Sequence, residues 1–364
     1  MKRRLILLFG VAVLLAWNIA PAAAGVPEAL DWLRARQVAD GGFAGDSDSA
    51  SSAPATMEAV FAIVAGGQDP AAWARDGNTP LSFLESQVDE ALKTPGDTAK
   101  LILAALAAGR DPRQFGGTDL VASLEATQDD SHIYGGTEAG NVFAQSLAIL
   151  ALQASRRPIS GPAVEWLVSV QLDDGSWSWN ADTTPGSGDS NSTALAVQAL
   201  QAAGGQEAAV ARALEYLRGL QNDDGGFPYQ KPSDFGTDTD ANSTAYVIQA
   251  LIATGHDPNG EDWAVNGATP VEALAALQQD SGAFVWQAAV PGENYLATAQ
   301  AVPALAGKAF LDISGSLDTG QVPAPAQLPA SGGVGLATVG RGAILTGLGL
   351  ALAAAGLAVR RRFS

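Results

Sequence analysis

A repeat of about fifty residues fills the middle of the chain, and it constrains the fold more than any other feature of the sequence. The segments Asp189–Leu200 and Asp240–Leu251 match at eight of twelve positions, with an offset of 51 residues. A unit of this length cannot bury its own apolar surface alone, so successive units must pack on one another. The chain is therefore predicted to be a repeat protein built from one supersecondary unit.

Each repeat contains an apolar helix that begins near a Thr-Ala step. The step recurs at Thr56, Thr98, Thr193, Thr244 and Thr298, and Gln145-Ser146 is a weak further copy. A glycine stands eleven residues after four of these threonines, and Asp-Pro follows that glycine in three copies. Because glycine followed by proline stops a helix, each copy is predicted to be a helix of about eleven residues.

A second pattern precedes these helices and reads glutamine, three residues, glycine, one residue and an aromatic. Good copies begin at Gln37, Gln171, Gln221 and Gln278, and degenerate copies begin at Gln87 and Gln128. The helix before each glutamine carries charged residues on one side and can face water, whereas the Thr-Ala helix is apolar on nearly all sides. One unit is thus an outer amphipathic helix, a glycine turn and an inner Ala/Leu helix.

Six such units fit between about Val26 and Phe310. Alternating solvated and fully covered helices produce two concentric rings, and the alanines allow the inner helices to approach closely around a small circle. The predicted fold is all-α, an (α/α)6 toroid of six helix pairs over residues 25–311. Closure of the ring leaves no terminal repeat exposed.

The repeat resembles those of two known families. Gln171–Trp177 matches the Q-x-x-x-G-x-W repeat of squalene and oxidosqualene cyclases, and Asp40–Phe43 and Asp224–Phe227 are similar to the repeat of protein prenyltransferase β-subunits. The resemblance covers nearly all of residues 25–311 and implies the same toroid. It also implies that the glutamine ties the end of an outer helix and that the aromatic packs against the neighbouring unit.

The chemistry of these families can be checked at individual residues. Prenyltransferases hold zinc with Asp, Cys and His, but this chain has no cysteine, and His132 and His256 lack ligand spacing. No cofactor is therefore predicted.

Cyclases use the middle acid of Asp-x-Asp-Asp, which aligns here with Asp240 or, by helix register, with Asn242. Both alignments lose the paired carboxylates, so a terpenoid cyclase with Asp240 as its acid stays an alternative.

Polar residues ahead of the inner helices form the predicted ligand site. One interpretation is N-capping, in which side-chain oxygens accept hydrogen bonds from the free helix amides. The other is a binding surface, because parallel inner helices gather their N-termini and their positive dipole ends at one mouth of the ring. A polar, cationic or sugar-like ligand would suit it. The residues are Glu138, Asp189, Asn191, Asp238, Asp240, Asn242 and Glu293.

Two further patterns bear on this mouth. Asp238, Asp240 and Asn242 have the spacing of the start of a calcium loop, without its glycine and closing glutamate, so calcium is considered as a ligand. The aromatics Trp179, Tyr229 and Trp286 follow the repeat turns and either line the mouth as a stacking surface or pack between repeats. A small-molecule site on the ring axis would require a cavity of about 300 Å³.

Both ends of the chain are predicted to be targeting segments. Basic residues, an apolar run and small residues over 1–24 predict a secretory signal peptide cleaved after Ala24. The uncharged stretch 342–359 precedes three arginines and is about 27 Å long as a helix, so 336–364 is predicted to be a transmembrane anchor with a basic cytoplasmic tail. Residues 312–335 are predicted to be a Pro/Ala/Gly/Ser-rich stalk. It contains a segment similar to cell-wall sorting signals cut by sortases, formed by Leu328, Pro329, Ala330, Ser331 and Gly332.

The charge of the chain restricts its partners. Seven of the 20 basic residues lie at the two ends, so the segment between them keeps 13 bases against 38 acids. Such a surface repels nucleic acid.

The predicted function is a non-catalytic module, anchored to the cell wall or plasma membrane, that binds an extracellular small molecule or surface partner. A structural cell-wall or adhesion module is the second alternative, beside the cyclase.

Overall fold

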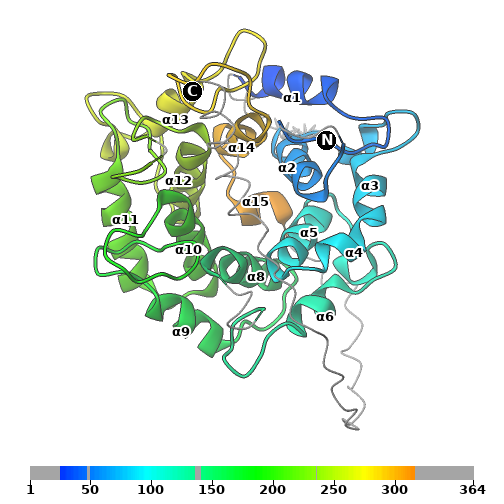
Figure 1. Cartoon of the computed structure of the whole chain (residues 1–364), viewed down its shortest axis with the longest axis horizontal. Coiled ribbons are helices and arrows are strands. Elements are labelled where there is room, and N and C mark those ends of the chain that lie inside the picture. The colour runs from blue at the N-terminus through cyan, green and yellow to red at the C-terminus, as the bar shows by residue number, and fades with distance from the viewer. Residues whose placement is uncertain (1–24, 47–49, 136–140, 235, 316–364) are drawn as a thin grey trace, which may run out of the picture.

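Six inner helices form a closed ring. The computed structural model describes residues 25–46, 50–135, 141–234 and 236–315. Each inner helix packs against the next, and the last packs against the first, so the ring closes as predicted (Figure 1). The inner helices are α2 (Ala53–Ala65), α5 (Pro95–Ala107), α8 (Val142–Ala154), α10 (Ser190–Ala203), α12 (Ala241–Ala253) and α14 (Tyr295–Leu305).

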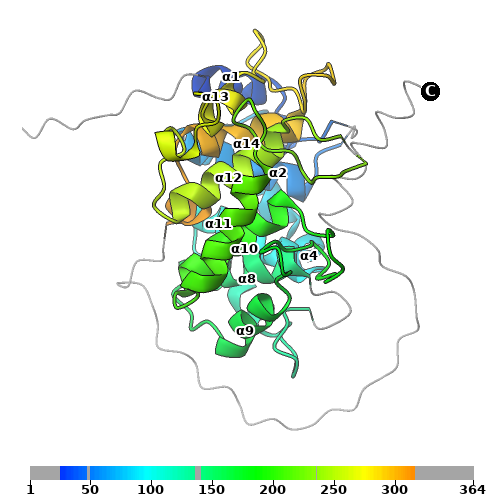
Figure 2. The same ribbon diagram turned by 90° about the vertical axis from the view of Figure 1, so that its left-hand side faces the viewer.

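A second set of helices surrounds this ring and forms the outer layer (Figure 1). Figure 2 shows the two layers from the side. The outer helices are α1 (Val26–Ala35), α3 (Pro80–Ser86), α4 (Val88–Ala91), α6 (Leu120–Glu125), α9 (Gly161–Ser169), α11 (Glu207–Leu220) and α13 (Pro270–Ala275). Three 3-10 turns lead into outer helices, at Pro70–Ala72, Pro112–Gln114 and Glu261–Trp263. The predicted all-α toroid is confirmed.

The motif glutamine joins neighbouring units. Gln221 Nε2 donates to the carbonyl of Gly225 in its own turn and to that of Trp263 in the next unit, both at 2.8 Å. Gln37, Gln171 and Gln278 make the same pair of bonds. The role that the resemblance implied for this glutamine is confirmed, because each side chain joins the end of its own outer helix to the next unit. The acceptor there lies at the start of the outer helix for Gln171 and Gln278, and at the end of the preceding 3-10 turn for Gln37 and Gln221.

The motif glycine allows this close approach. Gly175 has a φ of 92°, and a Cβ placed there would lie 2.3 Å from the carbonyl oxygen of Arg212 in α11. The aromatic two residues later is fully buried, as Trp177 shows. Its backbone N–H donates to Thr193 Oγ1 at 3.0 Å, so the threonine of the Thr-Ala step ties the turn to its inner helix.

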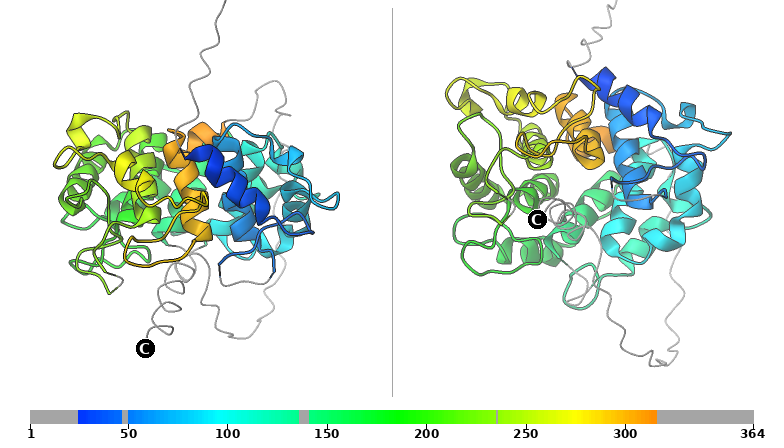
Figure 3. Two further views of the ribbon diagram at one scale, coloured as in Figure 1. Left: turned by 90° about the horizontal axis from the view of Figure 1, so that it is seen from above. Right: turned by 45° about the horizontal axis from the view of Figure 1, so that its top comes forward.

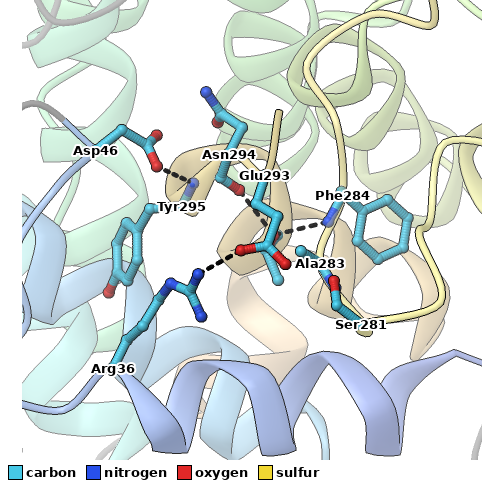
Figure 4. Close-up of polar contacts among 9 residues, drawn as sticks. Arg36, Asp46, Ser281, Ala283, Phe284, Glu293, Asn294 and Tyr295 are labelled. Atoms are coloured by element: carbon cyan, nitrogen blue, oxygen red, sulfur yellow. Dashed lines mark hydrogen bonds and ion pairs between the residues drawn. The ribbon is translucent and has the colours of Figure 1, made fainter. Parts of the chain in front are cut away.

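The first and last repeats meet in the same way (Figures 3 and 4). The backbone N–H of Tyr295, at the start of α14, donates to Asp46 Oδ1 of the first repeat at 2.6 Å. Arg36, just after α1, forms an ion pair with Glu293. Gln278 reaches the carbonyl of Gly25 at 2.7 Å. The seam therefore keeps the glutamine bond that joins other repeats, uses a side-chain carboxylate as the acceptor at the start of α14, and adds one surface ion pair.

A short helix that the repeat pattern did not predict lies at the centre of the ring. Helix α15 (Phe310–Ser314) follows α14 and packs against α2, α5 and α8 (Figure 1). It runs past residue 311, where the toroid was predicted to end, so the first residues of the predicted stalk belong to this central helix. The ring axis is therefore filled by the chain itself.

The predicted targeting segments lie outside the described residues. These are the signal peptide 1–24 with Ala24, the sorting motif Leu328–Gly332, most of the stalk, and the anchor 336–364. Within residues 25–315, apart from the gaps given above, no helix combines the length and the apolar character needed to cross a bilayer.

Replacing the motif glycine should destabilise the protein more than replacing a glycine in open space. Gly175→Ala and Gly255→Ala both force an alanine into positive φ, but only the first places a methyl group against a neighbouring backbone. We expect Gly175→Ala to lose roughly 1–3 kcal/mol more unfolding free energy than Gly255→Ala. Urea denaturation followed by circular dichroism measures the difference. Equal midpoints for the two variants would contradict the close contact between the Gly175 turn and the backbone of the next unit.

Candidate functional site

The predicted aromatics do lie at the N-terminal ends of inner helices. Each comes from the loop of the following repeat and presents its backbone carbonyl to the first turn of an inner helix. Trp179 is 43% exposed, and the side chains of Tyr229 and Trp286 are partly buried. The bonds run from Val142 N to Trp179 O at 3.0 Å, from Ser190 N to Tyr229 O at 2.9 Å and from Ala241 N to Trp286 O at 2.9 Å.

The two acids at this mouth cap their helices. Asp189 Oδ1 accepts from the backbone N–H of Ser192 at 2.7 Å, and Asp240 Oδ1 accepts from that of Ser243 at 2.9 Å. The residues are only 1% and 3% exposed, respectively. The N-capping interpretation is confirmed for both.

The second carboxylate oxygens of the two acids differ. The indole Nε1 of Trp286, in the next repeat, donates to Asp240 Oδ2. The hydroxyl of Tyr229 helps to lower the pKa of Asp189, but Asp189 Oδ2 is buried and has no hydrogen-bond partner among the described residues. Burial raises the pKa of each carboxyl to about 6, against the lowering effect of these hydrogen bonds. Both oxygens of Asp240 are thus engaged by donors, which leaves neither one facing the ring axis as a free acid.

The other predicted ligand residues are separated. Asp238 is exposed, whereas Asn242 is buried and donates to Gln300 Oε1 of α14 at 2.8 Å, so Asp238, Asp240 and Asn242 do not converge on one point. In the part of the chain that the structure describes, no three acidic or histidine side chains form a metal-binding group. Asn191 is buried on α10.

Glu293 lies at the seam between the first and last repeats, where it forms an ion pair with Arg36 (Figure 4). A hydrogen bond from Ser281 and the charge of Arg36 hold its pKa below the usual value. Glu138 falls outside the described residues. The predicted ring of acids is therefore divided between two buried caps, an exposed loop residue and a seam ion pair.

A polar network on the ring axis was not predicted. Lys100 of α5 forms a buried ion pair with Glu58 of α2. Gln300 Nε2 donates to the same Glu58 Oε1 at 2.9 Å, and Asn242 donates to Gln300. Four inner helices thus contribute one polar side chain each to a connected cluster. The inner helices around it are mostly apolar.

The sequence contained a signal for this cluster. Glu58, Lys100 and Gln300 each stand two residues after the threonine of their repeat. Equal offsets place them at the same level on the same face of neighbouring parallel helices. A charged pair at that register in an apolar helix is unusual, since buried charges are retained only when they are paired.

Aromatic rings fill the space beside this network. The ring of Phe310 from α15 lies 5.4 Å from Phe61 of α2 and 6.2 Å from Tyr246 of α12, and Phe143 of α8 lies 5.8 Å from Tyr246. Helices α8 and α12 are not neighbours in the ring, so these contacts cross its centre. A cavity of about 10 Å³ remains, lined by Glu58, Phe61, Ala245, Tyr246, Gln249, Gln300, Pro303, Phe310 and Ile313. That volume suits one water molecule and is far below the 300 Å³ required above for a ligand.

Comparisons with known proteins agree with this architecture. The sequence matches the prenyltransferase alpha-alpha toroid domain family over residues 6–93, 118–234 and 193–300. These segments make up well over half of the chain, which therefore belongs to this family. No curated protein sequence matches the chain at a significant level.

Solved structures share the fold at low sequence identity. The type II terpene cyclase MstE from Scytonema is 14% identical, with 78% of this chain and 96% of that chain covered and a TM-score of 0.54. The GH76A α-1,6-mannanase from Salegentibacter is 10% identical, with 78% and 98% covered and a TM-score of 0.56. At these identities the likeness establishes the toroid alone.

The axial ion pair gives a testable prediction. Lys100→Met leaves Glu58 buried without its cation, and we expect a loss of roughly 3–5 kcal/mol of unfolding free energy. Adding Glu58→Gln removes the uncompensated charge, so the double variant should recover most of that loss. Urea denaturation of the two single variants and the double variant measures the coupling. Additive losses would show that the pair acts as two independent groups.

The capping acids give a second prediction. Because their pKa in the folded state is about 6 against 3.8 for the free side chain, the folded protein binds protons that the unfolded chain has released between these values. The unfolding free energy contributed by each group therefore falls as pH rises from about 4 to 6. Asp240→Asn should reduce that fall by up to about 3 kcal/mol, and Asp189→Asn by a similar amount. Urea denaturation at several pH values measures the unfolding free energy. If it falls with pH as steeply in the variants as in wild type, the raised pKa values are not those of Asp189 and Asp240.

Proposed function

We propose that this toroid acts by binding, without catalysis, on the outside of the cell. The observation that carries the proposal is the state of Asp240, the acid at the cyclase-like position. Its two oxygens accept hydrogen bonds from Ser243 N and Trp286 Nε1, and it is buried behind them. General-acid catalysis needs a carboxyl whose proton can reach the substrate. An acid that caps a helix and has both oxygens hydrogen-bonded fits a structural role better than a catalytic one.

The proposed binding face is the mouth formed by the starts of α8, α10 and α12. Trp179 and Asp238 are exposed there, and parts of Tyr229 and Trp286 are accessible. An exposed indole stacks on the flat face of a sugar or another ring, and carboxylates accept hydrogen bonds from hydroxyl groups. The face therefore suits a polar, sugar-like extracellular ligand or a surface partner carrying one. The buried Asp189, Asn191, Asp240 and Asn242 would support this face from below.

The proposed location rests on the sequence. A signal peptide over 1–24, a sorting-type motif at 328–332 and an apolar helix with a basic tail over 336–364 would export the toroid and hold it at the cell wall or plasma membrane. Ser331 stands at the position where sorting signals carry threonine. The strongly acidic segment between the ends suits exposure to solvent and disfavours nucleic acid as a partner.

One observation favours a terpenoid cyclase as the alternative. Burial raises the pKa of Asp240 to about 6, and raised pKa values are a feature of catalytic acids. The filled axis favours a purely structural wall module as a further alternative, because it leaves room for about one water.

The experiment uses the full chain purified from membranes or cell walls. We expect native mass spectrometry to show a bound species on the wild type that is lost in Trp179→Ala and kept in Asp89→Ala, an exposed position on outer helix α4. Incubation with squalene should give no cyclised product with wild type or Asp240→Asn. Product formed by wild type and abolished in Asp240→Asn would establish the cyclase. A wild type that carries no bound species would favour the structural module.

A further inference from the structure

Helix α15 is attached to the toroid at two glycine positions. It has five residues, which is less than two turns, and it lies between Gly307 and Gly315, with φ angles of 67° and 62°. A Cβ added at either glycine would meet no atom within 4 Å. Glycine in open space can change its backbone angles at little cost, so both ends of α15 have the properties of hinges.

Phe310 makes the ring contacts of α15 and one of its hydrogen bonds to the ring wall. The Phe310 ring packs edge-on against Phe61 and tilted against Tyr246. Its backbone N–H donates to Gln198 Oε1 of α10 at 3.2 Å. A single aromatic inserted among aromatics of the ring wall resembles a bound ligand more than an additional repeat, because α15 has no outer-helix partner and no glutamine turn.

The fit of α15 to the axis is incomplete. Gln198 Nε2, Gln249 Oε1 and Ser314 Oγ are buried and have no hydrogen-bond partner among the described residues. Gln198 and Gln249 each stand five residues after the threonine of their repeat, on neighbouring helices, so they lie at the same level of the axis. Most buried polar groups in proteins have a hydrogen-bond partner, and a ligand on the axis would supply one for these two amides. One amide donor and one amide acceptor are thus left unused near Phe310, whose backbone N–H reaches Gln198 and whose side chain lines the small axial cavity together with Gln249.

We propose that α15 is a displaceable plug over an axial binding site that takes a ligand with an apolar ring and a hydroxyl or amide group. The ring would occupy the place of Phe310 against Phe61 and Tyr246. The hydroxyl or amide would accept a hydrogen bond from Gln198 Nε2 and donate one to Gln249 Oε1. This site lies on the axis and is additional to the proposed binding face at the mouth, so the two can be tested separately.

Opening of α15 can be measured because the chain has no cysteine. Ser314→Cys places the only thiol on α15, and Ala250→Cys places it at a fully buried position of α12 in the ring wall. With a thiol-reactive dye, we expect Ser314→Cys to react at least about tenfold faster, with a rate that low urea hardly changes, as local opening requires. Equal rates with equal urea dependence would show that α15 opens only when the ring unfolds, which overturns the plug.

A second pair of variants separates opening of α15 from fraying of its last residue. In the Ser314→Cys background, Phe310→Ala should speed labelling at least about tenfold further, because it removes the contacts that hold the whole helix in place. Lys308→Ala, an exposed substitution before α15, should leave the rate unchanged. Equal rates in the two variants would mean that only the helix end moves, and the plug would be wrong.

The ligand is tested with 1-naphthol, a fluorescent ring that carries one hydroxyl. We expect it to bind Phe310→Ala at least about tenfold more tightly than Lys308→Ala, and Gln198→Leu added to Phe310→Ala should reverse most of that gain. Naphthalene, which lacks the hydroxyl, should not respond to Gln198→Leu. Equal affinity of 1-naphthol for the Phe310→Ala and Lys308→Ala variants would overturn the axial site. Because this assay contains no glycan or cell surface, its result is independent of the proposed mouth binding.

Discussion

The fold depends on one side-chain amide that spans two repeats. In each good copy of the motif, a glutamine nitrogen donates to the carbonyl of its own turn and to a carbonyl of the next unit, as Gln37 does with Gly41 and Trp73. The bond to the next unit is made only where the two backbones approach closely, and the motif glycine permits that approach. The spacing of neighbouring repeats is therefore fixed locally at four of the six steps, and packing between inner helices completes the ring at the other two.

The inner ring follows from this spacing. Helices held so close together must present small residues to their neighbours, which explains the alanines of the Thr-Ala helices. The threonine has a second use, because its hydroxyl accepts the N–H of the turn aromatic while it also donates to the preceding turn of its own helix, as Thr56 does toward Phe43 and Ser52. A ring built from such narrow helices has a narrow axis, and one short helix is enough to fill it.

The features that recur between repeats could be predicted from the sequence. The inner helices, glutamine turns and the caps at Asp189 and Asp240 recur at fixed spacing, so they were predicted and are confirmed. Helix α15 was not predicted, because it occurs once and its partners come from helices spread over the whole ring. The Glu58–Lys100 pair joins residues 42 positions apart, and only the register of the two threonines relates them. The predicted calcium residues failed to converge because the start of α12 turns Asn242 inward, toward Gln300, and leaves Asp238 outside.

The unrepeated residues gather on the ring axis. The repeated contacts close the ring, whereas the residues on the axis differ from one inner helix to the next. Three features of the axis do not follow the repeat. They are an ion pair between α2 and α5, amide groups on α10 and α12 without a hydrogen-bond partner among the described residues, and an aromatic side chain supplied by α15. A buried ion pair is costly compared with apolar residues of the same size. Its presence is best explained if the axis must hold a particular arrangement of polar groups for an occupant, whether that occupant is the chain's own helix or a ligand that replaces it.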